Sequence, residues 1–326
     1  MKVTVKKVHG SGNDFYIIDE MLLSEALPEE KRRQLALTLC DRQQSLGGAD
    51  GVLYVSPSKT ALARMRVINS DGSEASMCGN GLRTVARYLA EKHQLTDFTV
   101  ETMKAILKVS EDEPLAEGIP TYRVEISPVT FAKETLPLVI DGEQLYDERV
   151  PAFSEQLHYS AVAVPNPHLI SFVEGADFAD QEKLARWLNS DNPYFTDGVN
   201  VSYVRRFSED AIFVKTYERG VGFTNACGTA MSASSLMARL IHGGDFERKI
   251  DVYNPGGRVQ CQVYREADTY RIDLIGNATF VFEAELVISA DAKAVTVMSQ
   301  TTTAEQIAYE RMAQQAAQFV EAQSSI

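Results

Sequence analysis

Short runs of alternating apolar and polar residues recur along the chain and predict strands. Longer runs with apolar residues three and four positions apart predict helices. Many short strands with a few helices between them indicate the α+β class. The expected helices are 28–40, 78–92, 180–188 and 227–241, and the expected strands are 3–8, 15–19, 52–55, 63–69, 97–101, 105–109, 121–127, 159–164, 169–173, 200–205, 211–217, 250–253, 258–264, 269–274 and 279–287.

Two of the expected helices lack a clear polar face. LRTVARYLA (82–90) is nearly apolar all round, and AMSASSLMARLI (230–241) is apolar or small on every side. A helix without a polar face is usually buried. We therefore expect each to be a central helix wrapped by a curled, mostly antiparallel sheet or barrel.

The sequence around these helices repeats at a constant offset, 227 − 78 = 149. GADGVLYV (48–55) matches the frame of DGVNVSYV (197–204), and RMRVIN (64–69) falls on FVKTYE (213–218). The chain therefore predicts two pseudo-symmetric domains and a helical extension. The first domain is 1–128, carries Cys78 and is completed by a strand at about 279–290; the second is 129–278 and carries Cys227; the extension is 291–326.

The extension has helix signals of its own. Thr302 with Glu305, and Thr303 with Gln306, each fit a capping box. An amphipathic helix that docks on the body, or on the partner subunit of a homodimer, is expected; a frayed tail is the alternative. The predicted apolar stripe is Ile307, Ala308, Met312, Ala316, Phe319 and Val320.

Composition narrows the function. The chain has 326 residues, 44% of them hydrophobic, which suits two packed domains. Its net charge of −13 disfavours nucleic acid and anionic membranes as partners. No apolar run suggests a signal peptide or membrane span, so a cytoplasmic protein is expected. An acidic small molecule would have to be bound by local positive groups.

Four cysteines stand at 40, 78, 227 and 261, without a CxxC pair. With five scattered histidines, this pattern indicates no metal site. Cys78 and Cys227 each precede a helix, where unpaired N–H groups favour a thiolate and attract anions. Thiols that approach one carbon from opposite sides could invert a stereocentre. Cys40 and Cys261 lack such surroundings and are expected to be packing residues.

These segments resemble the diaminopimelate epimerase family, cofactor-independent racemases that use two cysteines. The resemblance covers about 1–287 and leaves the extension outside. It rests on HGSGNDF (9–15), GGADG (47–51), NSDGSEASMCGNGLR (69–83), PNPH (165–168), GVNVSYV (198–204), YERGVG (217–222), ACGT (226–229) and NPGG (254–257).

The resemblance implies the roles of individual residues. Cys78 and Cys227 would be the catalytic acid–base pair, with no pyridoxal phosphate or other cofactor. Gly79, Asn80, Gly228 and Thr229 would hold the substrate α-carboxylate at the helix ends. Apart from the resemblance, His9, His168, Asp71 and Glu74 are expected to hold loops or orient neighbouring groups, with direct catalysis as the alternative. The residues implied to bind the distal ammonium and carboxylate are Asn13, Asn69, Asn166, Asn200, Glu218 and Arg219.

Phe223, Ala230 and Pro165 depart from the family pattern beside the reacting centre. They could reshape the pocket wall, so substrate preference stays open. The favoured reading is interconversion of LL- and meso-diaminopimelate. The alternatives are a cofactor-independent racemase of another amino acid such as histidine, an isomerase of the phenazine-biosynthesis type, and a redox sensor that forms a Cys78–Cys227 disulfide.

Overall fold

The computed structural model describes residues 1–174, 178, 180–267 and 269–324. These residues form two compact units. Unit 1 comprises Met1–Val124 and Gly276–Arg311, and unit 2 comprises Glu125–Ile275 and Met312–Ile326. The structure thus divides the chain after Val124, where the sequence suggested 128, and divides the extension between both units.

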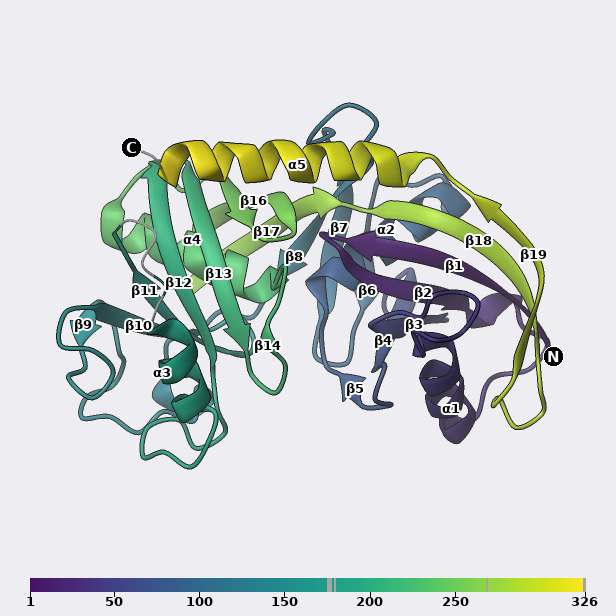
Figure 1. The fold of residues 1–326 in the computed structure, drawn as a ribbon, viewed down its shortest axis with the longest axis horizontal. Helices are drawn as coiled ribbons and strands as arrows, with labels where there is room; N and C mark the ends of the chain where they lie inside the picture. The colour runs from purple at the N-terminus through teal and green to yellow at the C-terminus, as the bar shows by residue number, and fades with distance from the viewer. Residues whose placement is uncertain (175–177, 179, 268, 325–326) are drawn as a thin grey trace. The chain divides into compact units, whose positions relative to one another are not determined.

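Unit 1 is built on one curled sheet with the order β19-β18-β1-β2-β3-β4-β6-β7-β8 (Figure 1). Only the β2–β3 and β4–β6 pairs are parallel. The strands are β1 (Lys2–Gly10), β2 (Asn13–Asp19), β3 (Gly51–Ser56), β4 (Ala63–Asn69), β5 (Glu74–Ala75), β6 (Asp97–Glu101), β7 (Ile106–Asp112), β8 (Thr121–Ile126), β18 (Thr279–Ile288) and β19 (Val295–Thr302), and the helices are η1 (Glu20–Leu22), α1 (Glu29–Cys40) and α2 (Gly79–His93).

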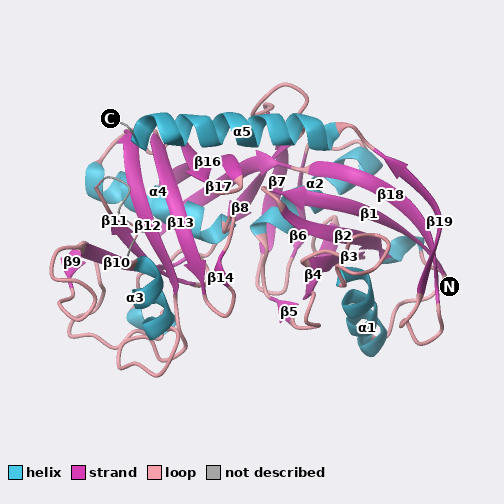
Figure 2. Cartoon of the chain, viewed as in Figure 1, coloured by secondary structure: helices cyan, strands magenta, loops and turns pink. Residues whose placement is uncertain are grey.

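Unit 2 has the order β9-β10-β11-β12-β13-β15-β16-β17, and its parallel pairs are β11–β12 and β13–β15 (Figure 2). Its strands are β9 (Glu148–Arg149), β10 (His158–Ala163), β11 (Pro167–Phe172), β12 (Asn200–Ser208), β13 (Ala211–Glu218), β14 (Gly222–Phe223), β15 (Lys249–Asn254), β16 (Gly257–Glu266) and β17 (Thr269–Asn277), and its helices are η2 (Lys133–Thr135), α3 (Gln181–Leu188) and α4 (Gly228–His242).

The two units share one connectivity. In each, a hairpin (β1–β2 or β10–β11) is joined through a helix to a parallel strand. A second hairpin and a short strand (β5 or β14) then lead into the cysteine helix and on to another parallel strand. The predicted sequence repeat is therefore a repeat of topology.

Each cysteine helix is surrounded by strands of its own unit. Helix α2 contacts β1, β2, β3, β4 and β7, and α4 contacts β10, β11, β12, β13, β15 and β16. From Gly79 to Leu89 only Tyr88 of α2 is not fully buried, and from Ala230 to Arg239 all of α4 is buried. The predicted fold, a curled sheet around a central helix, is confirmed.

The C-terminal segment was predicted only in part. Helix α5 (Glu305–Ser324) is present, and Met312 and Ala316 face inward as expected. Ile307 is 64% exposed and Tyr309 is buried, so the predicted stripe was wrong at its start. Strand β19 was not predicted, because most of its side chains are exposed and only pairing with β18 defines it.

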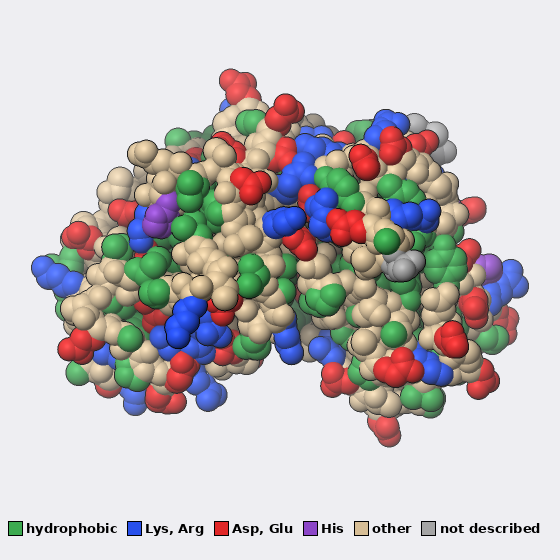
Figure 3. Space-filling view, turned by 180° about the vertical axis from the view of Figure 1, so that it is seen from behind, with side chains coloured by type: hydrophobic (Ala, Val, Ile, Leu, Met, Phe, Trp, Pro, Cys, Tyr) green, Lys and Arg blue, Asp and Glu red, His purple; other side chains and the backbone are tan. Residues whose placement is uncertain are grey.

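The surface carries both signs of charge. On the face in Figure 3, Lys and Arg side chains are interspersed with Asp and Glu. Described ion pairs on exposed side chains include Arg248 with Glu209 and Arg186 with Glu182. Among the described residues, no helix has both the length and the apolar character to cross a bilayer.

Candidate active site

Cys78 is the N-cap residue of α2. Its backbone is extended (φ −145°, ψ 105°), and its Sγ accepts a hydrogen bond from the Gly81 N–H at 3.3 Å. A hydrogen bond donated to sulfur favours the charged thiolate form. Gly81 also keeps the helix close to the sheet, since a Cβ there would lie 2.9 Å from Leu53 Cδ2. The thiol is half-buried.

Asn13 and Asn80 join Cys78 in what we call the Cys78 cluster. The Cys78 thiol donates to Asn13 Oδ1 at 3.7 Å, and Asn80 Nδ2 donates to the same oxygen at 3.4 Å. Asn13 Nδ2 in turn donates to Asp50 Oδ2 at 2.6 Å. Because Asp50 can only accept, it turns the Asn13 amide so that its oxygen faces the thiol.

Asp50 is itself held in place. Arg42 donates to both Asp14 and Asp50, at 2.7 and 2.8 Å, and Lys7 donates to Asp14. Asp50 belongs to the GGADG segment but was not predicted as a site residue. The motif was the signal that could have identified it.

The other predicted residues of unit 1 lie in two places. Gly79 is the first residue of α2. Asn69 ends β4, and its Nδ2 donates to Ser73 Oγ at 3.0 Å. Asp71 accepts from the Ser73 backbone at 2.8 Å and Glu74 pairs with Arg66, so both hold this loop as expected.

Cys227 is the N-cap residue of α4, the position that Cys78 occupies on α2. Its Sγ lies 3.4 Å from Thr229 Oγ1. It also hydrogen-bonds the carboxyl group of Glu218 at the end of β13. We call Cys227, Thr229 and Glu218 the Cys227 cluster. Gly228 is the first residue of α4.

In the Cys227 cluster, Cys227 is buried, Glu218 and Thr229 are half-buried, and the pKa values of Cys227 and Glu218 are shifted. Burial raises the pKa of the Cys227 thiol well above its usual value, and the neighbouring Glu218 raises it further. Burial also raises the pKa of Glu218, while hydrogen bonds from Thr224 and Cys227 oppose that shift. Cys227 is therefore held as a neutral thiol at neutral pH.

Thr224 is a residue that the sequence did not single out. Its Oγ1 donates to Glu218 Oε1 at 2.5 Å from the segment between β14 and α4. The β13–β14 pairing, Glu218 with Gly222, brings the two together. No local pattern predicts a contact that depends on a hairpin of this shape.

Asn200 and Arg219 meet beside this cluster. Asn200 Oδ1 accepts from the Arg219 backbone N–H at 2.8 Å. The Arg219 guanidinium donates to the carbonyl and carboxylate of Asp197, at 2.7 and 2.6 Å. Gly198, with φ +69°, turns the chain between Asp197 and Asn200; a Cβ there would lie 2.5 Å from Asn189 Oδ1.

Asn166 is paired with His168, which is completely buried. His168 Nε2 lies 3.1 Å from Asn166 Oδ1. Burial lowers the pKa of His168 to about 3, and the charge of Arg219 contributes. The ring is therefore neutral and carries one N–H. Because the Asn166 amide oxygen can only accept, Nε2 carries this proton and donates to it, which orients the Asn166 amide. Pro167 and His168 begin β11, which corrects the expectation that PNPH is wholly a turn.

The three departures from the family pattern lie in different surroundings. Phe223 is 40% exposed in β14, where its ring contacts Tyr217 and Lys215. Ala230 is fully buried in the first turn of α4. Pro165 is half-buried just before Asn166.

Cys40 and Cys261 are buried and carry no disulfide. Cys40 packs in the apolar core of unit 1, and burial raises its pKa to about 12. Cys261 pairs across the β15–β16 ladder with Ile250 and is fully buried. Both positions are those expected of packing residues.

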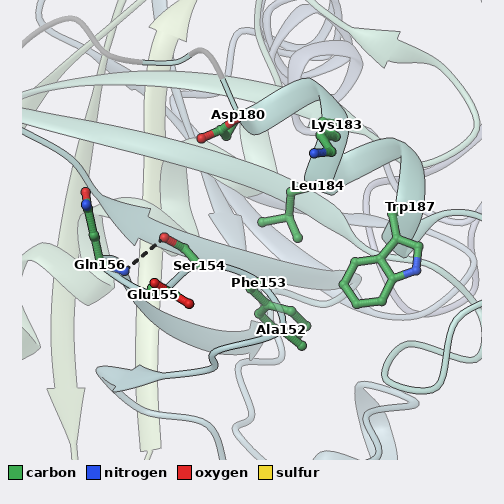
Figure 4. Close-up of a pocket in the computed structure, with 9 residues that line it drawn as sticks. All are labelled: Ala152, Phe153, Ser154, Glu155, Gln156, Asp180, Lys183, Leu184 and Trp187. Atoms are coloured by element: carbon green, nitrogen blue, oxygen red, sulfur yellow. Dashed lines mark hydrogen bonds between the residues drawn. The ribbon is translucent and has the colours of Figure 1, made fainter.

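A surface pocket of about 560 Å³ lies elsewhere in unit 2 (Figure 4). The segment 152–156 and α3 line it, with Phe153 and Trp187 as its aromatic walls. None of the predicted site residues lines this pocket. Within the described part of the chain, no cluster of three His, Cys, Asp or Glu side chains could hold a metal ion.

The arrangement of sheet and helices recurs in solved structures. A phenazine biosynthesis protein from Bacillus anthracis superposes with a TM-score of 0.64 and 19% identity, over 88% of this chain and all of that one. At this identity the likeness shows the fold alone. The class is therefore a two-unit α+β fold, and in this chain each unit has a cysteine at the N-cap position of its buried helix.

Sequence relatives specify the family. The diaminopimelate epimerase family model matches residues 5–121 and 160–281. A diaminopimelate epimerase of Listeria monocytogenes serotype 4a is 54% identical over 321 residues, covering 96% of this chain and 97% of the relative. One from Enterococcus faecalis is 53% identical over 288 residues, covering 86% and 87%. The chain belongs to the diaminopimelate epimerase family, and the predicted family and enzyme class are confirmed.

Proposed function

We propose that the protein interconverts LL- and meso-diaminopimelate, with Cys78 and Cys227 as its acid–base pair. The activity follows from the close relatives, which cover nearly the whole chain. The observation that best supports the residue assignment is that each cysteine is the N-cap of a buried helix in units of matching topology. The substrate is a small amino acid, and the described site residues provide its polar partners.

Inversion requires that a proton leave one face of the α-carbon and that another arrive on the opposite face. We assign the first removal to the thiolate form of Cys78, whose sulfur accepts the Gly81 backbone N–H. Cys227, a neutral thiol next to a carboxyl group, donates the new proton. The step leaves Cys78 as thiol and Cys227 as thiolate, so the roles are exchanged for the reverse direction.

Removing an α-proton creates carbanion-like charge that the protein must stabilise. Backbone N–H groups at a helix start carry partial positive charge and bind carboxylates. Gly79 and Asn80 begin α2, and Gly228 and Thr229 begin α4, so we assign these residues to the reacting end. Glycines beside both thiols allow the close approach of a ligand.

We assign the distal end of the substrate to Asn13, Asn69, Asn166, Asn200, Glu218 and Arg219. Arg219 presents a planar fork suited to a carboxylate, and Glu218 suits an ammonium group. The two are consecutive at the tip of the β13–β14 hairpin, and Arg219 contacts Asn200 through its backbone. His168 would keep the Asn166 amide in one orientation.

Solvent exchange tests the two-thiol assignment. In D2O, each turnover should place deuterium at the inverted carbon, and Cys78→Ala and Cys227→Ala should each reduce epimerisation by at least about a thousandfold. Chiral chromatography with mass detection measures both. Cys261→Ala is the matched control and should stay active. Rapid racemisation by either of the first two variants would refute the assignment.

Substitution of Arg219 tests the substrate. Arg219→Met should raise KM for diaminopimelate about ten- to a hundredfold, since a charge-assisted carboxylate contact contributes roughly 1.5–3 kcal/mol. Arg265→Met, an exposed arginine of the same unit, is the control. A screen with histidine, lysine and glutamate belongs to the same experiment. If a monocarboxylic amino acid is the better substrate, the alternative racemase function replaces this proposal.

A further inference from the structure

The first two turns of α5 contact the turn that precedes Asn13. Gln306 and Tyr309 both lie beyond residue 281, where the match to the family model ends. His9 Nε2 lies 2.9 Å from Gln306 Oε1, and the His9 and Tyr309 rings meet edge to face at 4.4 Å. All these residues belong to unit 1.

The hydrogen bonds around His9 define one tautomer. Its Nδ1 accepts the backbone N–H of Gly12 at 3.3 Å, which requires a lone pair on that nitrogen. The proton of the neutral ring is therefore on Nε2, which donates to Gln306 Oε1. Gln306 Nε2 donates to Glu310 Oε1 at 3.0 Å, so the Gln306 amide is also fixed with its oxygen toward His9.

The turn that His9 contacts has two consecutive residues in the left-handed region of φ. Ser11 and Gly12 both have positive φ, +56° and +78°, and Ser11 is a residue that rarely adopts such a conformation. Asn277 accepts the Ser11 N–H at 2.8 Å, and Arg83 of α2 donates to Ser11 Oγ at 3.1 Å. The next residue is Asn13, whose Oδ1 lies 3.7 Å from the Cys78 thiol.

The start of α5 is also tied to the cysteine helix. Glu305 accepts two hydrogen bonds from Arg87 of α2, at 2.5 and 2.7 Å, and one from the Phe280 N–H at 2.9 Å. Arg87 is buried and lies over the Phe280 ring at 3.8 Å. These bonds fix the position from which Gln306 reaches His9.

We propose that Gln306 is a positioning residue: it holds His9 in the Nε2–H tautomer, and His9 then sets the Ser11–Gly12 turn that places Asn13 beside Cys78. The extension would thus contribute to catalysis without touching the substrate. The inference rests on the proposed function.

Charge near His9 agrees with a neutral ring. Burial lowers the pKa of His9 to about 4, while the Gln306 contact and Asp14 of β2 oppose the shift. Arg83 of α2 and Lys7 of β1 lower it further. Glu310 reaches the ring only through the Gln306 amide.

The first test removes the acceptor. Gln306→Met retains the length of the side chain but cannot accept the His9 proton, and should lower kcat/KM for diaminopimelate about tenfold. Gln314→Met makes the same change at an exposed position of α5 and should leave kcat/KM unaltered. Thermal denaturation of both variants checks folding. Equal kinetics of Gln306→Met and the unaltered protein would overturn the role of Gln306.

The second test changes the charge at the same atom. In Gln306→Glu a carboxylate faces His9, and its negative charge raises the pKa of the His9 ring. Once the ring is protonated, its Nδ1 can no longer accept the Gly12 N–H. The acid limb of kcat/KM should therefore move up by about one pH unit or more, and should not move in Gln314→Glu. Long-range proton–nitrogen NMR of His9 should show Nε2–H in the unaltered protein at pH 7. Nδ1–H there would contradict the proposal.

Different results would contradict the proposed function and the positioning role of Gln306. If the unaltered protein does not epimerise diaminopimelate, the proposed function is wrong. If it does, and the Gln306 variants keep its rate and pH profile, only the positioning role is wrong.

Discussion

At the scale of single residues, Cys78 and Cys227 have the same helix position but different neighbours. Asn13 and Asn80 surround the first, and Glu218 and Thr229 surround the second. A carboxylate raises the pKa of a neighbouring thiol through its charge, whereas an amide carries no net charge. The two acids are therefore distinct before any substrate binds, although the sequence repeat makes them look equivalent.

Thr224 offers a test of this difference. Thr224→Val removes the hydrogen bond that favours the ionised form of Glu218, so the already raised pKa of Glu218 should rise further. If ionised Glu218 is needed, the acid limb of kcat/KM moves about half a unit to one unit higher. The pH profile of epimerisation measures it. Thr135→Val, at an exposed position, is the control, and an unchanged profile would exclude Glu218 from the acid limb.

At the scale of elements, each cysteine helix packs in the core of its unit and also carries a proposed catalytic thiol at its N-terminus. Their apolar faces are surrounded by strands, so each N-terminus is fixed by the core of its own unit. The sequence predicted both helices and most strands, since alternation and helical spacing are local properties. The short strands β5 and β14 were not predicted, because two residues carry no period and only pairing with β4 or β13 defines them.

The N-cap role of Cys78 separates stability from activity. Cys78→Ala removes the acceptor of the Gly81 N–H and should lower the free energy of unfolding by about 1 kcal/mol. Cys78→Ser keeps an acceptor, and should be at least as stable as the unaltered protein. Both should be inactive. Urea denaturation with activity assays compares them, and equal stability of the two variants would argue against the capping bond.

At the scale of the whole molecule, burial of two neutral histidines makes stability depend on pH. The pKa of His9 falls to about 4 and that of His168 to about 3, both below the usual 6.5. Between pH 6.5 and these lowered pKa values, the unfolded chain binds more protons than the folded chain. The associated stability is complete above about pH 6.5 and is lost as the pH falls toward 4 and 3, by up to about 1.4 kcal/mol per pH unit for each histidine.

Denaturant titrations from pH 7.5 to 5 measure this loss. His168→Gln should reduce the slope by about one proton, even if the variant is less stable at pH 7. His93→Gln, at the exposed end of α2, is the matched control variant. A slope that His168→Gln does not change would show that His168 is not neutral and buried.

The sequence by itself determined the repeated design, the buried cysteine helices, the family, and which residues to examine. These depend on local periodicity and on motifs that are continuous along the chain. The tertiary structure decided the partners: Asp50 orients Asn13, Thr224 binds Glu218, which lies beside Cys227, and Gln306 reaches His9 across 297 positions. Such contacts depend on which side chains strand pairing and helix docking bring together. A hydrogen bond is set by distance in space, which local sequence patterns do not encode.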